Sequence, residues 1–217
     1  MMNTKALQLL IQEAVTQEQE TGQLHQLLQQ RLKTVERIVE LPEVEALERL
    51  YEFVIRYIKQ VPQMLEDLHQ GATEAGLLNY VSPILEVVEG FFILPPKELN
   101  KETGLVALMD EAFLAHRLFE EVNDTYIMRM GQPMIPFDMT MSNIIIHTLI
   151  SEPFGNELEQ IVMMGVKDIF GEQKANKEND KFVALMNQKE NDNLVRIAQH
   201  WPCMSTQMGL DRHLKSA

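Results

Sequence analysis

The sequence predicts an all-α fold: a single globular helical bundle of about seven helices with a loosely attached C-terminal helical tail. Apolar residues recur at three- and four-residue spacing along most of the first 170 residues, which is the period of a helix with one buried face. No stretch alternates apolar and polar residues as a half-buried strand would. Hydrophobic residues make up 45% of the 217 residues, enough to build a core.

The chain divides into two parts by composition. Residues 1–170 carry the helical patterns and are predicted to form the bundle domain. Residues 171–217 are rich in Lys, Asn and Glu, and contain only two short apolar clusters, each preceded by the same Lys-Glu-Asn-Asp sequence. Such a segment buries little apolar surface, so we expect a charged, partly ordered C-terminal tail.

The first half of the bundle is divided by turn residues. The predicted helices cover about 3–20 and 22–41, and the short link at Thr21-Gly22 favours an antiparallel pair. A third helix should begin at Pro42, and Pro62 should open a separate short segment that ends at Gly71. Residues 73–90 read as a further helix with a kink or break near Ser82-Pro83.

Residues 104–129 form the predicted central helix. Their apolar stripe repeats at three- and four-residue steps: Leu108, Ala112, Ala115, Phe119, Val122 and Tyr126. Ionisable residues flank this stripe. Glu111 lies on one side of it, His116 on the other, and Glu120 follows His116 one turn later.

The helix at 139–151 carries no charged residue. Asp138 or Thr140 can cap its start, and one face is made of Ile, Leu and Met. The opposite face is polar but uncharged: Thr140, Asn143, His147 and Ser151. In a protein this acidic, an uncharged polar stripe indicates an internal helix whose polar groups bond to other protein groups. A last bundle helix follows from Asn156 to Phe170.

These two helices give one candidate site, a polar or metal cluster of His116, Glu120, His147, Glu111 and Asn143. We expect His147 to hydrogen-bond a side chain of the central helix, first His116 or Glu120. The commoner interpretation of such a cluster is a structural hydrogen bond or ion pair. The alternative is a binding site for a first-row metal ion, because imidazole and carboxylate groups can both be its ligands. Carboxylates at 152, 157 and 159 either stabilise the start of the last helix or add to the His147 site.

Charge limits the partners. The net charge is −13, and residues 61–170 hold 5 basic and 17 acidic residues. So acidic a region repels nucleic acid and anionic lipid, which predicts no nucleic-acid and no membrane partner. A cationic partner remains open, although a solvated acidic surface that aids solubility is the simpler interpretation.

The expected cellular location and the absence of an assigned reaction both rest on sequence motifs that the chain lacks. Cys203 is the single cysteine, the N-terminus has no signal-peptide pattern, and no run of about 18 apolar residues is free of charge. A cytoplasmic location is therefore expected. No phosphate-binding loop, zinc-protease motif or nucleophile motif occurs.

The sequence therefore favours a soluble, non-catalytic protein with a protein–protein interaction or structural role, either as a homo-oligomer or as a partner-binding module. No catalytic residue and no cofactor is assigned. The alternative is a metal-dependent or acid–base helical enzyme, with its His/Glu site between the helices at 104–129 and 139–151. A divalent metal is expected only if the His/Glu cluster is a metal site.

Overall fold

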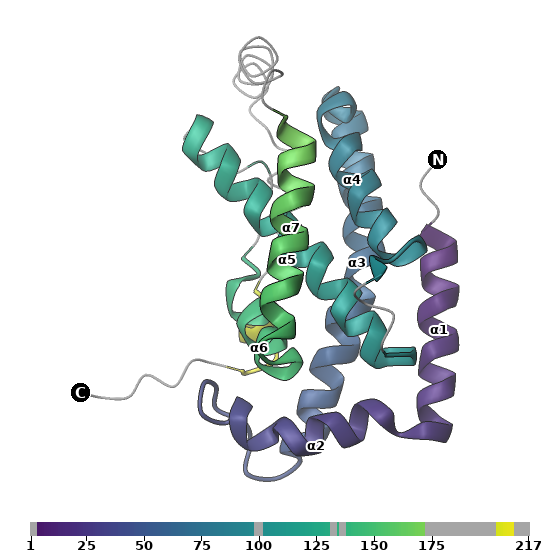
Figure 1. The fold of residues 1–217 in the computed structure, drawn as a ribbon, viewed down its shortest axis with the longest axis vertical. Helices are drawn as coiled ribbons and strands as arrows, with labels where there is room; N and C mark the ends of the chain where they lie inside the picture. The colour runs from purple at the N-terminus through teal and green to yellow at the C-terminus, as the bar shows by residue number, and fades with distance from the viewer. Residues whose placement is uncertain (1–3, 98–101, 131–133, 135–137, 172–202, 211–217) are drawn as a thin grey trace, which may run out of the picture.

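The all-α prediction is confirmed in a computed structural model of the chain, which describes residues 4–97, 102–130, 134, 138–171 and 203–210 (Figure 1). The described residues form eight helices and no β-strand. Seven of them precede residue 171, the number predicted for the bundle. In order they are α1 (Thr4–Thr21), α2 (Gln23–Val35), α3 (Ala46–Ala75), α4 (Leu78–Ile93), α5 (Gly104–Met130), α6 (Thr140–Ile150), α7 (Phe154–Phe170) and α10 (Met204–Gln207).

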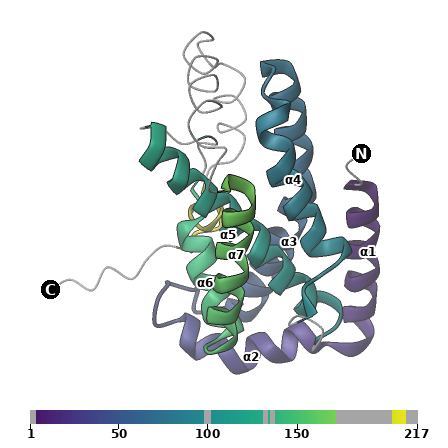
Figure 2. The same cartoon turned by 45° about the horizontal axis from the view of Figure 1, so that its top comes forward.

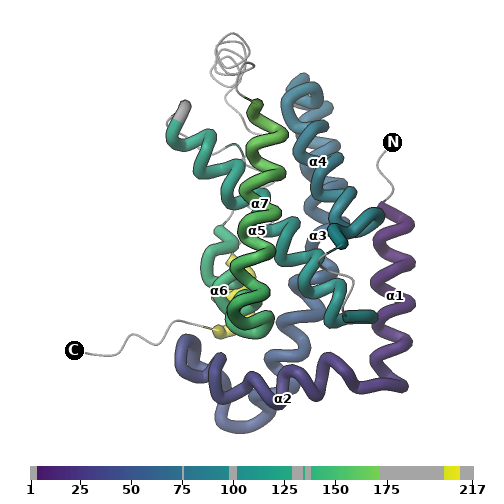
Figure 3. Tube along the Cα trace, in the orientation of Figure 1, coloured from purple at the N-terminus to yellow at the C-terminus, as the bar shows by residue number. Residues whose placement is uncertain are grey.

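Helix α5 is the element around which the others pack. It crosses the middle of the molecule and contacts α1, α2, α3, α4, α6 and α7 (Figure 3). Its predicted stripe is buried throughout, and residues 112–115 are all fully buried. Four consecutive buried positions cannot lie on one helix face, so neighbours enclose α5 on several sides.

Helix α2 lies across one end of the bundle, which contradicts the predicted antiparallel pairing with α1 (Figures 1 and 2). The chain turns at Gly22, whose φ of 61° is the left-handed conformation that glycine adopts readily. The buried carboxylate of Glu18 then accepts the backbone N–H groups of Leu24 and His25, each at 3.0 Å. This contact fixes α2 by its first turn, so local geometry rather than link length sets its direction.

The predicted break at Pro62 is wrong, because α3 continues through it from Ala46 to Ala75. Proline inside a helix removes one hydrogen bond and costs about 3 kcal/mol. Residues on both sides of Pro62 face the core, from Leu50 to Ala72, and their burial offsets that cost. Gly76 follows the last residue of the helix, and the Leu77 N–H donates to the Ala72 carbonyl at 2.7 Å.

Helix α6 is internal, as its lack of charge predicts. Only Thr140 of its residues is exposed, and Ile145, Ile146 and Leu149 are fully buried. The Asp138 carboxylate accepts the Thr140 backbone N–H at 2.9 Å and so satisfies one free donor at the helix start.

Residues 203–210 pack against the bundle. Met204, Ser205 and Leu210 are buried, α10 contacts α6, and the Gln207 side chain is hydrogen-bonded to Arg56 of α3. The two Lys-Glu-Asn-Asp sequences lie outside the described residues, so the predicted boundary at residue 170 stays a prediction. In the part of the chain that is described, no helix has the length and apolar character needed to cross a membrane.

Candidate functional site

Glu120 of α5 joins the central helix to α6. Its carboxylate accepts hydrogen bonds from Thr140 Oγ1 and Asn143 Nδ2, each at 2.7 Å. Arg117, one turn earlier on α5, donates a third bond at 2.6 Å. The structure thus brings together two members of the predicted cluster, Glu120 and Asn143. The polar face of α6 is uncharged because its side chains donate to a carboxylate on α5.

Helix α3 extends this contact into the core through Tyr57. The Tyr57 hydroxyl donates to Asn143 Oδ1 at 2.7 Å, so Asn143 is bonded at both ends of its amide. Burial raises the pKa of Tyr57 well above its usual value, and the nearby charge of Glu120 raises it further. Tyr57 therefore remains a neutral donor, and the bonds Tyr57–Asn143–Glu120 hold α3, α6 and α5 together.

Arg117 connects the same network to α7. Its Nε lies 2.9 Å from Glu159 Oε1, and its two terminal nitrogens donate to Glu120, Glu121 and Glu159 at 2.6–2.9 Å. Burial lowers the pKa of Arg117, but the bonds and charges of Glu159 and Glu120 outweigh this effect and raise it overall. Arg117 is therefore always charged, and all three of its nitrogens are engaged.

His116 is fully buried and faces Tyr57 rather than α6. Its Nε2 lies 3.0 Å from the Tyr57 backbone carbonyl, and the two rings are 4.1 Å apart between centroids. Burial lowers the pKa of His116 to about 4, so the ring is neutral at pH 7. Since a carbonyl oxygen only accepts, Nε2 carries the proton. Nδ1 is then an acceptor that has no hydrogen-bond partner among the described residues.

The predicted hydrogen bond between His147 and either His116 or Glu120 is wrong. In the described part of the chain the His147 side chain makes no hydrogen bond; its ring packs 5.8 Å from that of Phe113. A Cβ atom at Gly155 would lie 2.6 Å from His147 Nε2, so this glycine lets α7 approach the imidazole. Asn143, one turn earlier on α6, takes the position beside Glu120 that was expected for His147.

Glu111 also lies apart from the network. It and its neighbour Asp110 are buried, and burial raises the pKa of each to about 8. Part of this rise comes from a neighbouring charge, that of Glu102 at Asp110 and that of Asp110 at Glu111. The predicted cluster therefore does not converge on one point. No group of three or more His, Cys, Asp or Glu residues in the described ranges is placed to hold a metal ion.

The buried Glu111 carboxyl predicts a pH effect. Its pKa is about 8 in the folded chain and near the ordinary value of 4.5 when unfolded, so the folded state binds more protons between these values. Stability should fall as pH rises through that window. We expect Glu111→Gln to flatten this decline and to raise the free energy of unfolding at pH 8 by about 2 kcal/mol. Urea denaturation at pH 5 and pH 8 measures this, and an unchanged slope would contradict it.

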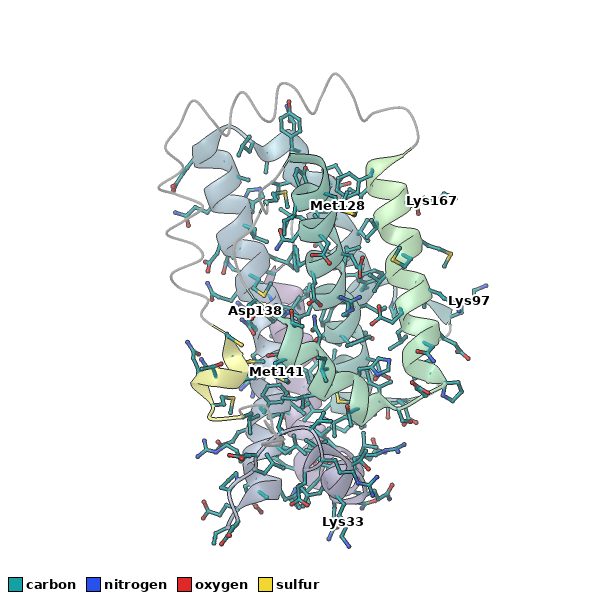
Figure 4. All side chains as sticks on the ribbon, turned by 90° about the vertical axis from the view of Figure 1, so that its left-hand side faces the viewer. Lys33, Lys97, Met128, Asp138, Met141 and Lys167 are labelled. Carbon is teal, nitrogen blue, oxygen red and sulfur yellow. The ribbon has the colours of Figure 1, made fainter. Side chains whose placement is uncertain are left out.

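A pocket of about 290 Å³ opens beside the network, where α5, α6 and α7 meet. In Figure 4 this side faces the viewer, with Asp138 and Met141 at the start of α6, Met128 at the far end of α5 and Lys167 on α7. The pocket joins charged and polar groups to two apolar ones. Its lining consists of Phe113, Arg117, Glu120, Thr140, Asn143, Ile144, His147, Thr148 and Glu159.

Two central members of this site, Arg117 and Tyr57, were not predicted from the sequence. The three- and four-residue spacing of Arg117 from Glu120 and Glu121 could have indicated the local ion pairs. The contact with Glu159 depends on how α7 packs, which spacing does not reveal. Comparisons with protein-family models, with curated proteins and with solved structures found no match to this chain.

Proposed function

We propose that the chain is a non-catalytic partner-binding protein and that another protein binds where α5, α6 and α7 meet. The observation that carries this proposal is the pocket, whose charged groups are bonded to one another and to α6 while the space beside them is open. A surface of this kind can bind a partner without reorganising its own hydrogen bonds, so the entropy cost of ordering its side chains on binding is small.

Exposed apolar side chains continue the same face. Met163 follows Glu159 by one turn on α7, and Ile127 follows Glu120 by two turns on α5, so each lies nearly in line with a pocket residue. Met163 is 53% exposed, Ile127 45% and the adjacent Met128 80%. Apolar groups gathered beside a polar pocket are typical of protein-binding surfaces, and methionine adapts well to a partner's shape. We call the pocket lining with these three residues the α5–α6–α7 face.

The pocket chemistry favours binding over catalysis. Its lining includes no Ser, Cys or Lys, and both threonine hydroxyls already donate, Thr140 to Glu120 and Thr148 to the Ile144 carbonyl. Among the described residues, no carboxylate is hydrogen-bonded to His147 to orient its ring as a general base; the ring packs against Phe113. The enzyme alternative would need His116 and His147 to act on one substrate, and His116 is enclosed in the core.

Charge favours a different protein over a second copy of this chain. Two copies would each bring a net charge of −13, and the α5–α6–α7 face lies within the region of 5 basic and 17 acidic residues. Such copies repel one another unless an attraction outweighs the charge.

Site-specific photocrosslinking tests this proposal. A small diazirine amino acid is placed at Thr148 or, as control, at Thr16 on α1; each hydroxyl bonds the carbonyl four residues earlier. After irradiation in cells that natively express the chain, we expect one discrete heterologous adduct from position 148 and none from position 16. A dimer of this chain, or equal adducts from both positions, would contradict the proposal.

A further inference from the structure

We infer that the pocket of the α5–α6–α7 face binds a basic side chain, a lysine or an arginine, presented by the partner protein. This inference rests on the proposed function and specifies the partner's chemistry. Three features carry it: the charge balance of the pocket, the carboxylates that already bond its arginine, and the apolar residues that line the same pocket.

The pocket region has an excess of negative charge. Arg117 is the cation at its centre, and three carboxylates surround it, those of Glu120, Glu121 and Glu159. One positive charge against three negative charges leaves a net of −2. These side chains are 16–31% exposed, so solvent screens their field only in part. A cation entering the pocket is attracted, and an anion is repelled.

The surroundings of Arg117 do not favour an acidic partner. Four of its five N–H donors already bond carboxylates, and the three carboxylates around it repel an incoming acidic group. The carboxylates themselves have hydrogen-bonding capacity left. A carboxylate accepts about four hydrogen bonds, whereas Glu120 and Glu159 each receive three within the described residues. Glu159 is the more exposed and is the acceptor we assign to the incoming cation.

Phe113 and Ile144 supply an apolar wall to the same pocket. The methylene stem of lysine or arginine packs on such a surface while its charged end remains near the carboxylates. A guanidinium can also lie over the face of an aromatic ring. The volume of about 290 Å³ is at the lower end of ligand pockets, a size suited to one side chain rather than to a large cofactor.

Peptide titration tests the inference without knowledge of the partner. The probes are three blocked pentapeptides of glycine with arginine, citrulline or glutamate at the centre, titrated at low ionic strength into the ¹⁵N-labelled full chain. Citrulline has the shape of arginine without its charge. We expect the arginine peptide to shift the amide signals of Ile144 and Thr148, with affinity at least about fivefold above that of citrulline, the factor that about 1 kcal/mol represents. The glutamate peptide should shift neither signal.

Two variants on one helix separate the pocket from the general acidity of the protein. Glu159→Gln and Glu157→Gln remove the same charge from α7, but Glu157 is exposed and does not line the pocket. The first should weaken binding of the arginine peptide about fivefold and the second less than twofold. Thr148→Phe, which fills the pocket without changing charge, should abolish the shifts at Ile144.

Several results would overturn the inference: equal binding of the arginine and citrulline peptides, equal loss in the two glutamine variants, or no shift with any peptide. The proposed function has a separate outcome. If Thr148 crosslinks to a heterologous partner but the arginine peptide does not bind, the face binds a protein by other chemistry. If the peptide binds and no crosslink forms, the pocket accepts cations but the chain does not use this face for a protein.

Discussion

Leu149→Ala should lower the free energy of unfolding by about 2–5 kcal/mol, the range for removing a large apolar side chain from a packed core. Leu149 is fully buried in α6, a helix with no charged residue that contacts α2, α5, α7 and α10. A cavity there weakens several interfaces at once. Urea denaturation measures the loss, and amide hydrogen exchange of α6 in the unaltered chain should be among the slowest.

Leu9→Ala on α1 is the matched control. It removes the same atoms from a side chain that is 63% exposed, so we expect a loss below about 0.5 kcal/mol. Exchange in α6 as fast as in the loops, or equal losses from the two variants, would contradict an internal α6.

Arg117→Met should lower the free energy of unfolding by about 2–4 kcal/mol at neutral pH. Removing one partner of a buried ion pair typically costs about 3–5 kcal/mol, because it leaves the other charge uncompensated. Here three carboxylates lose their shared cation, and their partial exposure reduces the penalty. Methionine retains much of the apolar stem, so the measured loss reports mainly the charge and its hydrogen bonds.

Arg49→Met provides the comparison for this substitution. Arg49 pairs with Glu52 at 3.3 Å on the surface of α3, and the two side chains are 45% and 61% exposed. Its loss should cost less than about 1 kcal/mol. A cost for Arg117→Met no greater than that for Arg49→Met would show that the Arg117 network does not hold α5 and α7 together.

Helical spacing predicted most of the fold. The stripe of α5 and the internal position of α6 follow from residue type alone, because burial of apolar side chains dominates the energy of such helices. Proline residues predicted the ends of helices less reliably. Pro62 lies inside α3 because the core on both sides of it offsets the lost hydrogen bond, a tertiary effect that a local pattern does not contain.

The site was predicted in part for a related reason. The uncharged polar face of α6 indicated that a partner exists on α5, and Glu120 with Asn143 is that pair. Which residue of α6 bonds Glu120 depends on how α6 is rotated about its axis and shifted along it relative to α5. A shift of one turn exchanges Asn143 for His147, and neither spacing nor composition fixes that shift. The contributions of α3 and α7, through Tyr57 and Glu159, required the assembled fold.

The most direct test of the central claim is the structure of this chain bound to the protein that crosslinks at Thr148. We predict a lysine or arginine side chain of the partner in the pocket, with its stem against Phe113 and Ile144 and its charged group at Glu159. A complex in which the partner binds elsewhere and leaves the α5–α6–α7 face exposed would contradict the proposed function. A complex with an acidic or apolar side chain in the pocket would contradict the inferred partner chemistry.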